Sequence, residues 1–249
     1  PIGSRGLGDV YKRQGLKELM RSGVTIFPGS NCDRDIIVAL KEISGKTPIK
    51  MWHKDTEFPN LDLIVIPGGF SFGDYLRCGA LAARSPIIKN IKNHISRGGA
   101  VLGICNGFQI LIEAGILPGS LIRNEKLLFT CRKTILEIQD SMISPFLSGL
   151  KKGQYLNIPV AHNEGNFFAS ETLLNELKNE GRIAFKYVKE ANTDDDYNPN
   201  GSCNDIAGIL SKNGKVLGMM PHPERAIYNL HGGTDGLKFL SKTFEKLIG

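Results

Sequence analysis

The chain of 249 residues contains one segment whose residue types suit a cysteine nucleophile. In the sequence GICNG at residues 103–107, Cys105 lies between small residues directly after an apolar run. This pattern is typical of a nucleophile elbow, a tight turn between a strand and a helix whose N-terminus favours a thiolate. The backbone N–H of Asn106 would then face an oxyanion formed beside Cys105. The alternative is a buried structural cysteine at the end of a core strand.

A second segment, PHPE at residues 221–224, supplies the base that a cysteine nucleophile requires. His222 and Glu224 lie two residues apart, so an extended chain places both side chains on the same side. Pro223 favours that extended conformation at His222. We predict that His222 acts as the base and that Glu224 orients it. The alternative is a surface loop with a solvated histidine and glutamate.

Two further segments follow apolar runs and contain residues suited to ligand contact. Gly68 and Gly69 are adjacent, which lets the backbone approach a ligand closely and present N–H groups. His162 precedes the polar sequence NEGN and could line the same crevice, although structural polar contacts are an equal alternative. Ligands bind at the carboxyl ends of parallel strands, so the loops after residues 66, 104 and 219 can converge on one crevice.

Short apolar runs alternate with amphipathic stretches in the first half of the chain. Strands are expected at residues 24–27, 49–53, 61–66 and 100–104, and helices at 33–42, 76–83, 86–96 and 107–114. This alternation predicts an α/β fold with a doubly wound, mostly parallel sheet. In the second half, strands are expected at 126–139, 155–161, 182–188, 205–210 and 215–219, and helices at 171–179 and 234–247. Because few helices separate these later strands, we predict antiparallel additions to the edge of the sheet.

The composition excludes several classes of protein. Hydrophobic residues make up 41% and charged residues 22% of the chain, as in globular domains rather than disordered or collagen-like chains. No apolar run reaches the ~20 residues of a membrane span, and the net charge of +6 is scattered, so we expect neither membrane nor nucleic-acid binding. Five cysteines without a CxxC pair indicate free thiols in a reducing, cytoplasmic setting. No spacing of cysteine and histidine suits a metal site.

Residues 1–19 carry no regular apolar pattern and lack the apolar core of a secretory signal. Our hypothesis is that they form a non-native or disordered leader, with the native start at Met20. Residues 20–249 are then expected to form a single catalytic domain.

Several motifs resemble those of the class I (triad) glutamine amidotransferases and, among them, the small glutaminase subunits of phosphoribosylformylglycinamidine synthase. The sequences VLGICNGFQIL (101–111) and VLGMMPHPERA (216–226) are similar to the whole triad class. The sequences IPGGFSFGDYLRCGA (66–80) and IPVAHNEGNF (158–167) narrow the resemblance to this subunit. Further matches are FPGSNCDRD (27–35), LPGSLIRN (117–124) and NDIAG (204–208). The resemblance implies a flavodoxin-like architecture.

The same resemblance implies a role for each site residue. The thiol of Cys105 would attack the side-chain amide of L-glutamine, and His222 would protonate the departing ammonia and then activate water. Glu224 would orient and charge-stabilise His222. Backbone N–H groups of Gly69 and Asn106 would form the oxyanion hole.

Gln109 would help to bind L-glutamine, and we add His162 to the expected glutamine-binding residues. The resemblance implies that this chain binds no cofactor. A separate large synthetase subunit would use ATP and Mg, and a small accessory subunit would complete the complex. In agreement, the sequence has no GxxxxGK[ST] phosphate loop. The loop that contains Asp74 and Cys78 is a candidate contact surface for the partner.

Two alternatives belong to different functional classes. A related cysteine hydrolase of the same fold commonly has histidine directly after the nucleophile and an acid from another loop, whereas this chain has Asn106 and PHPE. A non-catalytic binding module would have lost its activity, which the intact Cys105, His222 and Glu224 argue against.

Overall fold

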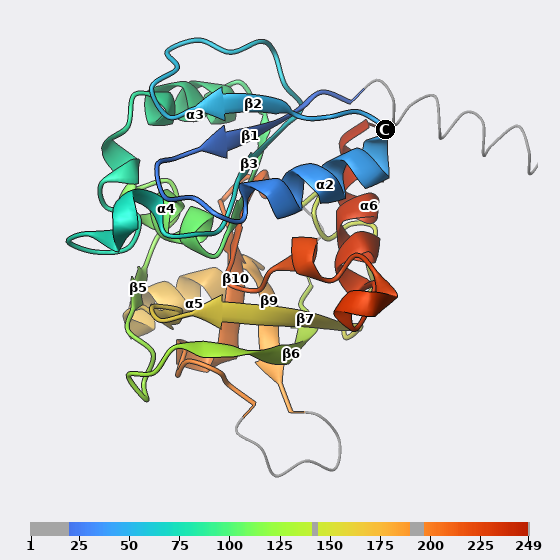
Figure 1. Ribbon diagram of the computed structural model, residues 1–249. Helices are drawn as coiled ribbons and strands as arrows, with labels where there is room; N and C mark the ends of the chain where they lie inside the picture. The colour runs from blue at the N-terminus through green and yellow to red at the C-terminus, as the bar shows by residue number, and fades with distance from the viewer. Residues whose placement is uncertain (1–19, 141–143, 190–196, 249) are drawn as a thin grey trace, which may run out of the picture.

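The computed structural model describes residues 20–140, 144–189 and 197–248. Nine strands form one sheet in the order β2-β1-β3-β4-β11-β10-β9-β6-β7 (Figure 1). The first five strands in this order are parallel, and the other four are antiparallel to their neighbours. The predicted doubly wound sheet with antiparallel additions is therefore confirmed. The leader expected at residues 1–19 lies outside the described residues.

The sequence predicted each strand of this large sheet, but neither strand of a second, two-stranded sheet. The parallel strands are β2 (Ile49–Trp52), β1 (Ser22–Ile26), β3 (Leu63–Ile66), β4 (Ala100–Ile104) and β11 (Val216–Met219). The antiparallel strands are β10 (Ile206–Leu210), β9 (Ile183–Val188), β6 (Thr130–Ile138) and β7 (Tyr155–His162). The small sheet pairs β5 (Ser120–Ile122) with β8 (Asn166–Phe168). The α-helices are α2 (Asp33–Ser44), α3 (Ile87–Ser96), α4 (Asn106–Glu113), α5 (Glu171–Asn179) and α6 (Asp235–Ile248).

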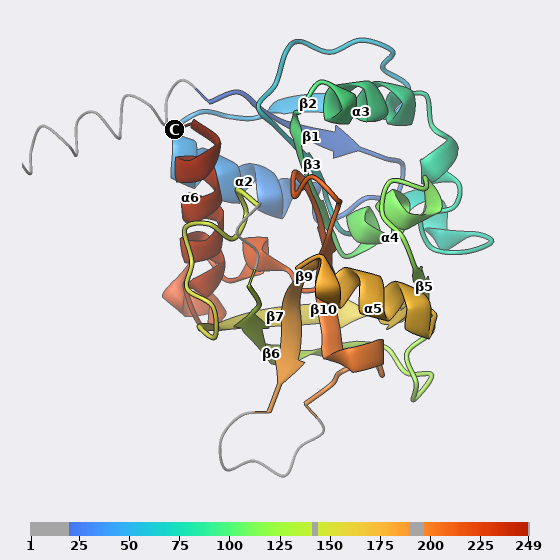
Figure 2. The ribbon, with the colours of Figure 1, turned by 180° about the vertical axis from the view of Figure 1, so that it is seen from behind.

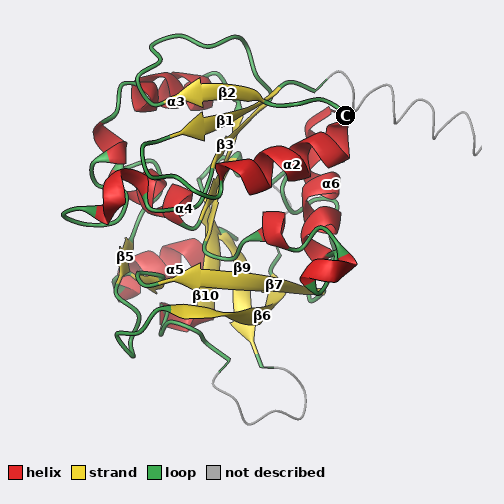
Figure 3. Cartoon of the chain, in the orientation of Figure 1, coloured by secondary structure: helices red, strands yellow, loops and turns green. Residues whose placement is uncertain are grey.

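Helices cover both faces of the large sheet (Figure 2). Helices α2 and α6 contact each other on one face, while α3 and α4 pack against β4 on the other. Figure 3 shows the strands in yellow between these two groups of red helices. Every residue of β3, β4 and β11 is buried, which explains why these strands are continuous apolar runs. Among the residues that the structure describes, no helix is long and apolar enough to cross a membrane.

The prediction of a helix at residues 76–83 is wrong. Only a short 3₁₀ turn at Ala82–Arg84 forms there. Leu76 and Gly79 have positive φ angles of 70° and 80°, which a right-handed helix cannot contain. A Cβ at Gly79 would lie 2.8 Å from the backbone nitrogen of Ile110, so this loop packs directly against α4. Tertiary contact therefore overrides local helix propensity here.

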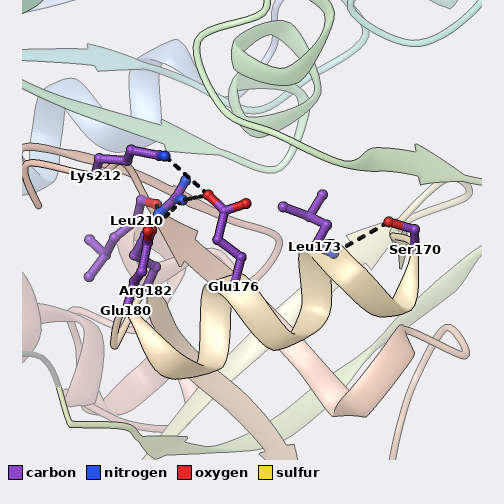
Figure 4. A network of polar contacts seen from close by, with 7 residues as sticks. All are labelled: Ser170, Leu173, Glu176, Glu180, Arg182, Leu210 and Lys212. Atoms are coloured by element: carbon purple, nitrogen blue, oxygen red, sulfur yellow. Dashed lines mark hydrogen bonds and ion pairs between the residues drawn. The ribbon is translucent and has the colours of Figure 1, made fainter.

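A buried arginine attaches α5 to the antiparallel half of the sheet (Figure 4). Nε of Arg182 donates to the Leu210 carbonyl oxygen at 3.0 Å, and Nη1 donates to the carboxylates of Glu176 and Glu180. A buried charge without such partners would be strongly destabilising. The network thus joins the end of α5 to β9 and β10.

Gly107 lies where α4 meets β3, and a Cβ at this position would overlap the carbonyl oxygen of Ile66. We expect Gly107→Ala to lower the free energy of unfolding by about 3 kcal/mol, the upper end of the usual overpacking range. Gly153→Ala is the control, because Gly153 has a φ of 74° but no neighbouring atom within 4 Å. The control should lose only about 1–2 kcal/mol from backbone strain. Urea denaturation measures both variants, and equal losses would show that the contact with Ile66 is unimportant.

Candidate active site

Four loops that follow the carboxyl ends of β1, β3, β4 and β11 meet around Gly68. A Cβ at Gly68 would lie 2.7 Å from His222 Cε1 and 3.3 Å from the Sγ atom of Cys32. It would also lie 3.4 Å from Cys105 Cβ. The nucleophile and base predicted from the sequence are therefore close together, and only glycine leaves room between them.

Cys105 occupies the turn between β4 and α4 in a conformation that few residues adopt. Its φ of 49° and ψ of −105° lie outside the ordinary regions for a residue with a Cβ. The N–H of Cys105 donates to the Met219 carbonyl oxygen at 2.8 Å, which holds the turn against β11. The side chain is buried, and Sγ lies 3.6 Å from the carbonyl oxygen of Ala161. The structure thus has the strained, externally supported turn of a nucleophile elbow.

His222 and Glu224 form a buried pair next to Cys105. Nδ1 of His222 lies 2.6 Å from Oε1 of Glu224, and both side chains are 1% exposed. The N–H of His222 donates to the Pro159 carbonyl oxygen at 2.8 Å, which fixes this segment against β7. Burial alone lowers the pKa of His222, but the Glu224 carboxylate and then the Cys105 sulfur raise this pKa well above its ordinary value. The Glu224 carboxylate therefore favours the protonated, cationic form of the imidazole.

Two polar atoms of the pair, His222 Nε2 and Glu224 Oε2, have no hydrogen-bond partner among the described residues. The sulfur atoms of Cys105 and Cys32 are nevertheless close enough to raise the pKa of His222. Catalytic contacts are often long in the absence of substrate and shorten in the complex. Nε2 is therefore available to exchange a proton with a group bound at Cys105.

Of the residues predicted for the oxyanion hole, Gly69 lies in the loop after β3 and Asn106 directly follows Cys105. Asn106 is the first residue of α4, and N–H groups of a first helical turn have no carbonyl partner within the helix. Gly69 has a φ of 132°, and a Cβ there would lie 2.7 Å from the backbone nitrogen of Asn31. Only glycine fits this position. The oxyanion role of both N–H groups stays a prediction that this placement favours.

Gln109 is buried on α4, with both ends of its side-chain amide in hydrogen bonds. Its Nε2 donates to the Glu164 carbonyl oxygen at 2.6 Å, and its Oε1 accepts from Asn106 Nδ2 at 2.9 Å. The Asn106 side chain also donates to Asp74 and accepts from the N–H of Ser71. This network joins α4 to the loop after β3 and to the turn after β7. Gln109 lines the pocket, and its role in glutamine binding stays a prediction.

His162 ends β7 and lines the same pocket, but both of its ring nitrogens are engaged. Nδ1 lies 3.1 Å from Asn124 Oδ1, and Nε2 lies 3.3 Å from Asn200 Nδ2. Burial, and then the charge of His222, lower the pKa of His162 to about 4, so the ring is neutral at physiological pH. With no ring nitrogen free, His162 can serve glutamine binding only through the groups that it positions.

A small pocket opens beside Cys105. Its lining includes polar groups from both halves of the sheet: Asn31, Cys32, Gly69, Asp74, Cys78, Gln109, His162, Asn163, Glu164, His222 and Arg225. Burial raises the pKa of Cys78, and the carboxylates of Asp74 and Glu164 raise it further. This second thiol therefore stays protonated and is a poor nucleophile.

Sequence reasoning missed Cys32 and Arg225, which also line the pocket. Nη2 of Arg225 donates to Cys32 Sγ at 2.9 Å, and its Nε lies 3.4 Å from the Asp35 carboxylate. A signal for Cys32 was present, because the rule for carboxyl ends of parallel strands also applies to the loop after β1. Arg225 follows Glu224 directly, but nothing in the sequence indicates its contact with Cys32.

Cys32, His222 and Glu224 each offer one potential metal ligand, and these atoms lie within 4.8 Å of one another. The positively charged guanidinium of Arg225 already donates to the Cys32 sulfur, and Glu224 already binds Nδ1 of His222. A second cation at this position would be repelled. The arrangement therefore favours proton transfer over metal binding, and the expected lack of a metal stays a prediction.

A known domain family matches most of this chain. Residues 20–234 match the CobB/CobQ-like glutamine amidotransferase domain. The chain belongs to this family. The amidotransferase is 52% identical over 217 residues to a protein of Mesorhizobium japonicum, covering 87% of this chain and 95% of that protein. It is 47% identical over 229 residues to a protein of Nostoc, and this match covers 92% of this chain and 99% of that protein.

Both relatives are named phosphoribosylformylglycinamidine synthase subunit PurQ. Among solved structures, the amidotransferase resembles a chain of PurLQS from Thermotoga maritima with a TM-score of 0.79 and 40% identity. The match covers 90% of this chain and 97% of that one. The chain is therefore a glutamine amidotransferase enzyme, which confirms the family expected from the motifs. The alternative hydrolase and the non-catalytic module are not favoured.

We expect Glu224→Gln to lower the pKa of His222, because the burial penalty remains while the carboxylate that opposes it is lost. A raised histidine pKa stabilises the fold below the unfolded value of ~6.5, and this contribution disappears as pH rises through the folded pKa. The variant should therefore lack the extra stability that the raised His222 pKa gives at low pH. Its glutaminase rate should fall by about 10²–10⁴-fold.

NMR titration of the His222 ring measures the pKa directly. Glu164→Gln is the control, because Glu164 is another pocket carboxylate but does not bind the His222 ring. An unchanged His222 pKa in Glu224→Gln would contradict the assigned role of this carboxylate.

Proposed function

We propose that this chain is the glutaminase subunit of a phosphoribosylformylglycinamidine synthase in de novo purine biosynthesis. The observation that carries the chemistry is the buried His222–Glu224 pair next to the strained turn of Cys105. The names of relatives that are 47–52% identical over most of the chain support the specific reaction. That reaction converts formylglycinamide ribonucleotide, ATP, L-glutamine and water into formylglycinamidine ribonucleotide, ADP, phosphate and glutamate.

The first half of the glutaminase reaction forms a thioester. The Cys105 sulfur attacks the side-chain carbonyl carbon of L-glutamine, and the carbonyl oxygen becomes an oxyanion. The N–H groups of Gly69 and Asn106 stabilise this oxyanion, and each such donor is worth about 10²–10³-fold in rate. Protonated His222 then gives its Nε2 proton to the leaving nitrogen. The C–N bond breaks, ammonia leaves, and a γ-glutamyl thioester remains on Cys105.

The second half regenerates the enzyme with water. Neutral His222 now accepts a proton at Nε2 from a water molecule, which attacks the thioester carbonyl carbon. Glu224 stabilises the imidazolium that forms and keeps Nδ1 as a donor. The C–S bond then breaks, glutamate leaves, and the sulfur and imidazolium return to their starting states.

Ammonia from this reaction would pass to an ATP-dependent synthetase subunit, and a small accessory subunit would complete the assembly. The similarity of this chain to a chain of PurLQS from Thermotoga maritima supports a complex of this kind. ATP and Mg would be bound by the synthetase, and this chain would bind no cofactor of its own. We propose a cytoplasmic location, where purine biosynthesis and free thiols are compatible.

Exposed apolar side chains that adjoin pocket residues in the sequence suit contact with that synthetase. Leu127 and Leu128 are 69% and 67% exposed in the turn before β6, next to the pocket residue Phe129. Tyr75 and Leu76 are exposed in the loop that contributes Asp74 and Cys78 to the pocket. Exposed apolar groups that gather around an active-site mouth indicate an interaction surface.

We expect Cys105→Ala to abolish glutamine-dependent synthesis by the assembled complex, because no thioester can form. Synthesis from added ammonia should survive, since that step belongs to the synthetase. The assay follows glutamate release and formylglycinamidine ribonucleotide formation, with and without the synthetase. Wild-type glutamate release should rise when the synthetase and its substrates are added. The absence of any release in the assembled wild type, or joint loss of both syntheses in a folded variant, would overturn the proposal.

We expect Leu128→Asp to weaken binding of the synthetase about tenfold or more, because it places a charge in an apolar contact. Leu230→Asp is the matched control, since Leu230 is 98% exposed and is not part of the pocket lining. Isothermal titration calorimetry of each variant with the synthetase measures the dissociation constant. Equal affinity of the two variants would place the interface elsewhere.

A further inference from the structure

His162 is surrounded by buried polar side chains from distant parts of the chain. Asn124 follows β5, and Asn200 and Ser202 precede the 3₁₀ turn at Cys203–Asp205. All of these residues are at most 4% exposed. Buried polar groups of this kind must satisfy one another, so their donors and acceptors can be assigned from the contacts.

Backbone groups fix the orientation of the two asparagine amides. Nδ2 of Asn124 faces the carbonyl oxygens of Leu128 and His162, and its Oδ1 faces the N–H of Gly165. Nδ2 of Asn200 faces the Gly165 carbonyl oxygen, and its Oδ1 faces the N–H of Ser202. Carbonyl oxygens only accept and backbone N–H groups only donate, so neither amide can be reversed.

These orientations determine the protonation of the His162 ring. Nδ1 lies 3.1 Å from an acceptor, Asn124 Oδ1, and therefore carries the proton. Nε2 lies 3.3 Å from a donor, Asn200 Nδ2, which also faces the Gly165 carbonyl oxygen and the Tyr187 hydroxyl, so an unprotonated Nε2 suits this side of the ring. The ring is thus neutral, with its proton on Nδ1, and it has no hydrogen bond left to offer a ligand.

The turn after His162 closes around this ring. A Cβ at Gly165 would lie 2.5 Å from ring atoms of His162, and both backbone groups of Gly165 bind the same two asparagines. Glu164 lies between His162 and Gly165 in the sequence, and its carbonyl oxygen accepts from Gln109 Nε2 at 2.6 Å. Any movement of the ring therefore moves the carbonyl group that orients Gln109 in the pocket.

We propose that His162 is a positioning residue, whose neutral ring fixes the turn at residues 163–165 so that Glu164 holds Gln109 in the geometry that recognises glutamine. The inference rests on the proposed glutaminase function but predicts its own structural signature. In this proposal the His162 ring does not contact glutamine. It affects the affinity for glutamine indirectly, through Glu164 and Gln109.

The first test uses the full wild-type chain and needs no activity. Long-range ¹H–¹⁵N NMR of the His162 ring should show the Nδ1–H tautomer from pH 6 to 8 with no titration, and addition of glutamine should not change it. An Nε2–H tautomer, a charged ring, or a change of tautomer with glutamine would overturn the proposal.

The second test compares His162→Leu, which loses both ring hydrogen bonds, with His162→Gln, which can still donate and accept. In the complex with the synthetase, His162→Leu should raise KM for glutamine about tenfold or more, because the recognition groups are displaced. The rate at which iodoacetamide alkylates Cys105 should stay within about twofold, because this small reagent needs no glutamine recognition. His162→Gln should restore most of the lost affinity.

His94→Leu is the matched control. His94 is also buried, and its ring packs against Gly99 and lies 3.1 Å from the Ala100 carbonyl oxygen, away from the pocket lining. It should leave KM for glutamine unchanged. An unchanged KM in His162→Leu, or an alkylation rate that falls as much as KM rises, would overturn the proposal. A failure of the proposed function would instead appear as no glutamate release by the wild-type complex.

Discussion

The strained turn at Cys105 is the constraint on which the rest of the site depends. A φ of 49° and a ψ of −105° are unfavourable for a cysteine, so the neighbouring strands must hold the turn in place. The Met219 carbonyl oxygen binds the Cys105 N–H from β11, and Gly107 allows α4 to touch β3. The parallel strands on both sides of β4 therefore support the proposed nucleophile. The loops that continue from those same strands contain Gly69 and His222, the proposed oxyanion donor and base.

The two pocket histidines show how neighbouring groups decide the charge of a buried ring. Burial lowers the pKa of His222 and of His162 alike. At His222 the Glu224 carboxylate, with the sulfur atoms of Cys105 and Cys32, outweighs burial and raises the pKa of the ring, which favours its protonated form. At His162 the neighbours are neutral amides, and the charge of His222 lowers the pKa further. One ring is consequently equipped to move protons, and the other is equipped to hold a fixed shape.

Local patterns were sufficient to predict the sheet, the nucleophile turn and the histidine–glutamate segment. Continuous apolar runs gave the buried strands, and residues within five positions of one another define the GICNG and PHPE segments. Features that depend on contacts between distant segments could not be predicted. The loop at residues 76–81 is shaped by packing on α4, and β5 pairs with β8 across more than forty residues. The contact between Cys32 and Arg225 is of the same kind.

The antiparallel half of the sheet gives the pocket a second wall, built on strands other than those that pair with β4. β7 brings the Ala161 carbonyl oxygen to Cys105 and the Glu164 carbonyl oxygen to Gln109, although neither β6 nor β7 pairs with a parallel strand. Asn124 binds this wall through Gly165 and also binds the exposed turn before β6 through the Leu128 carbonyl oxygen. A partner that binds this turn would be linked to Gly165, and so to the β7 side of the pocket, through the side chain of Asn124. The strained turn of Cys105, held by β3 and β11, would not have to move.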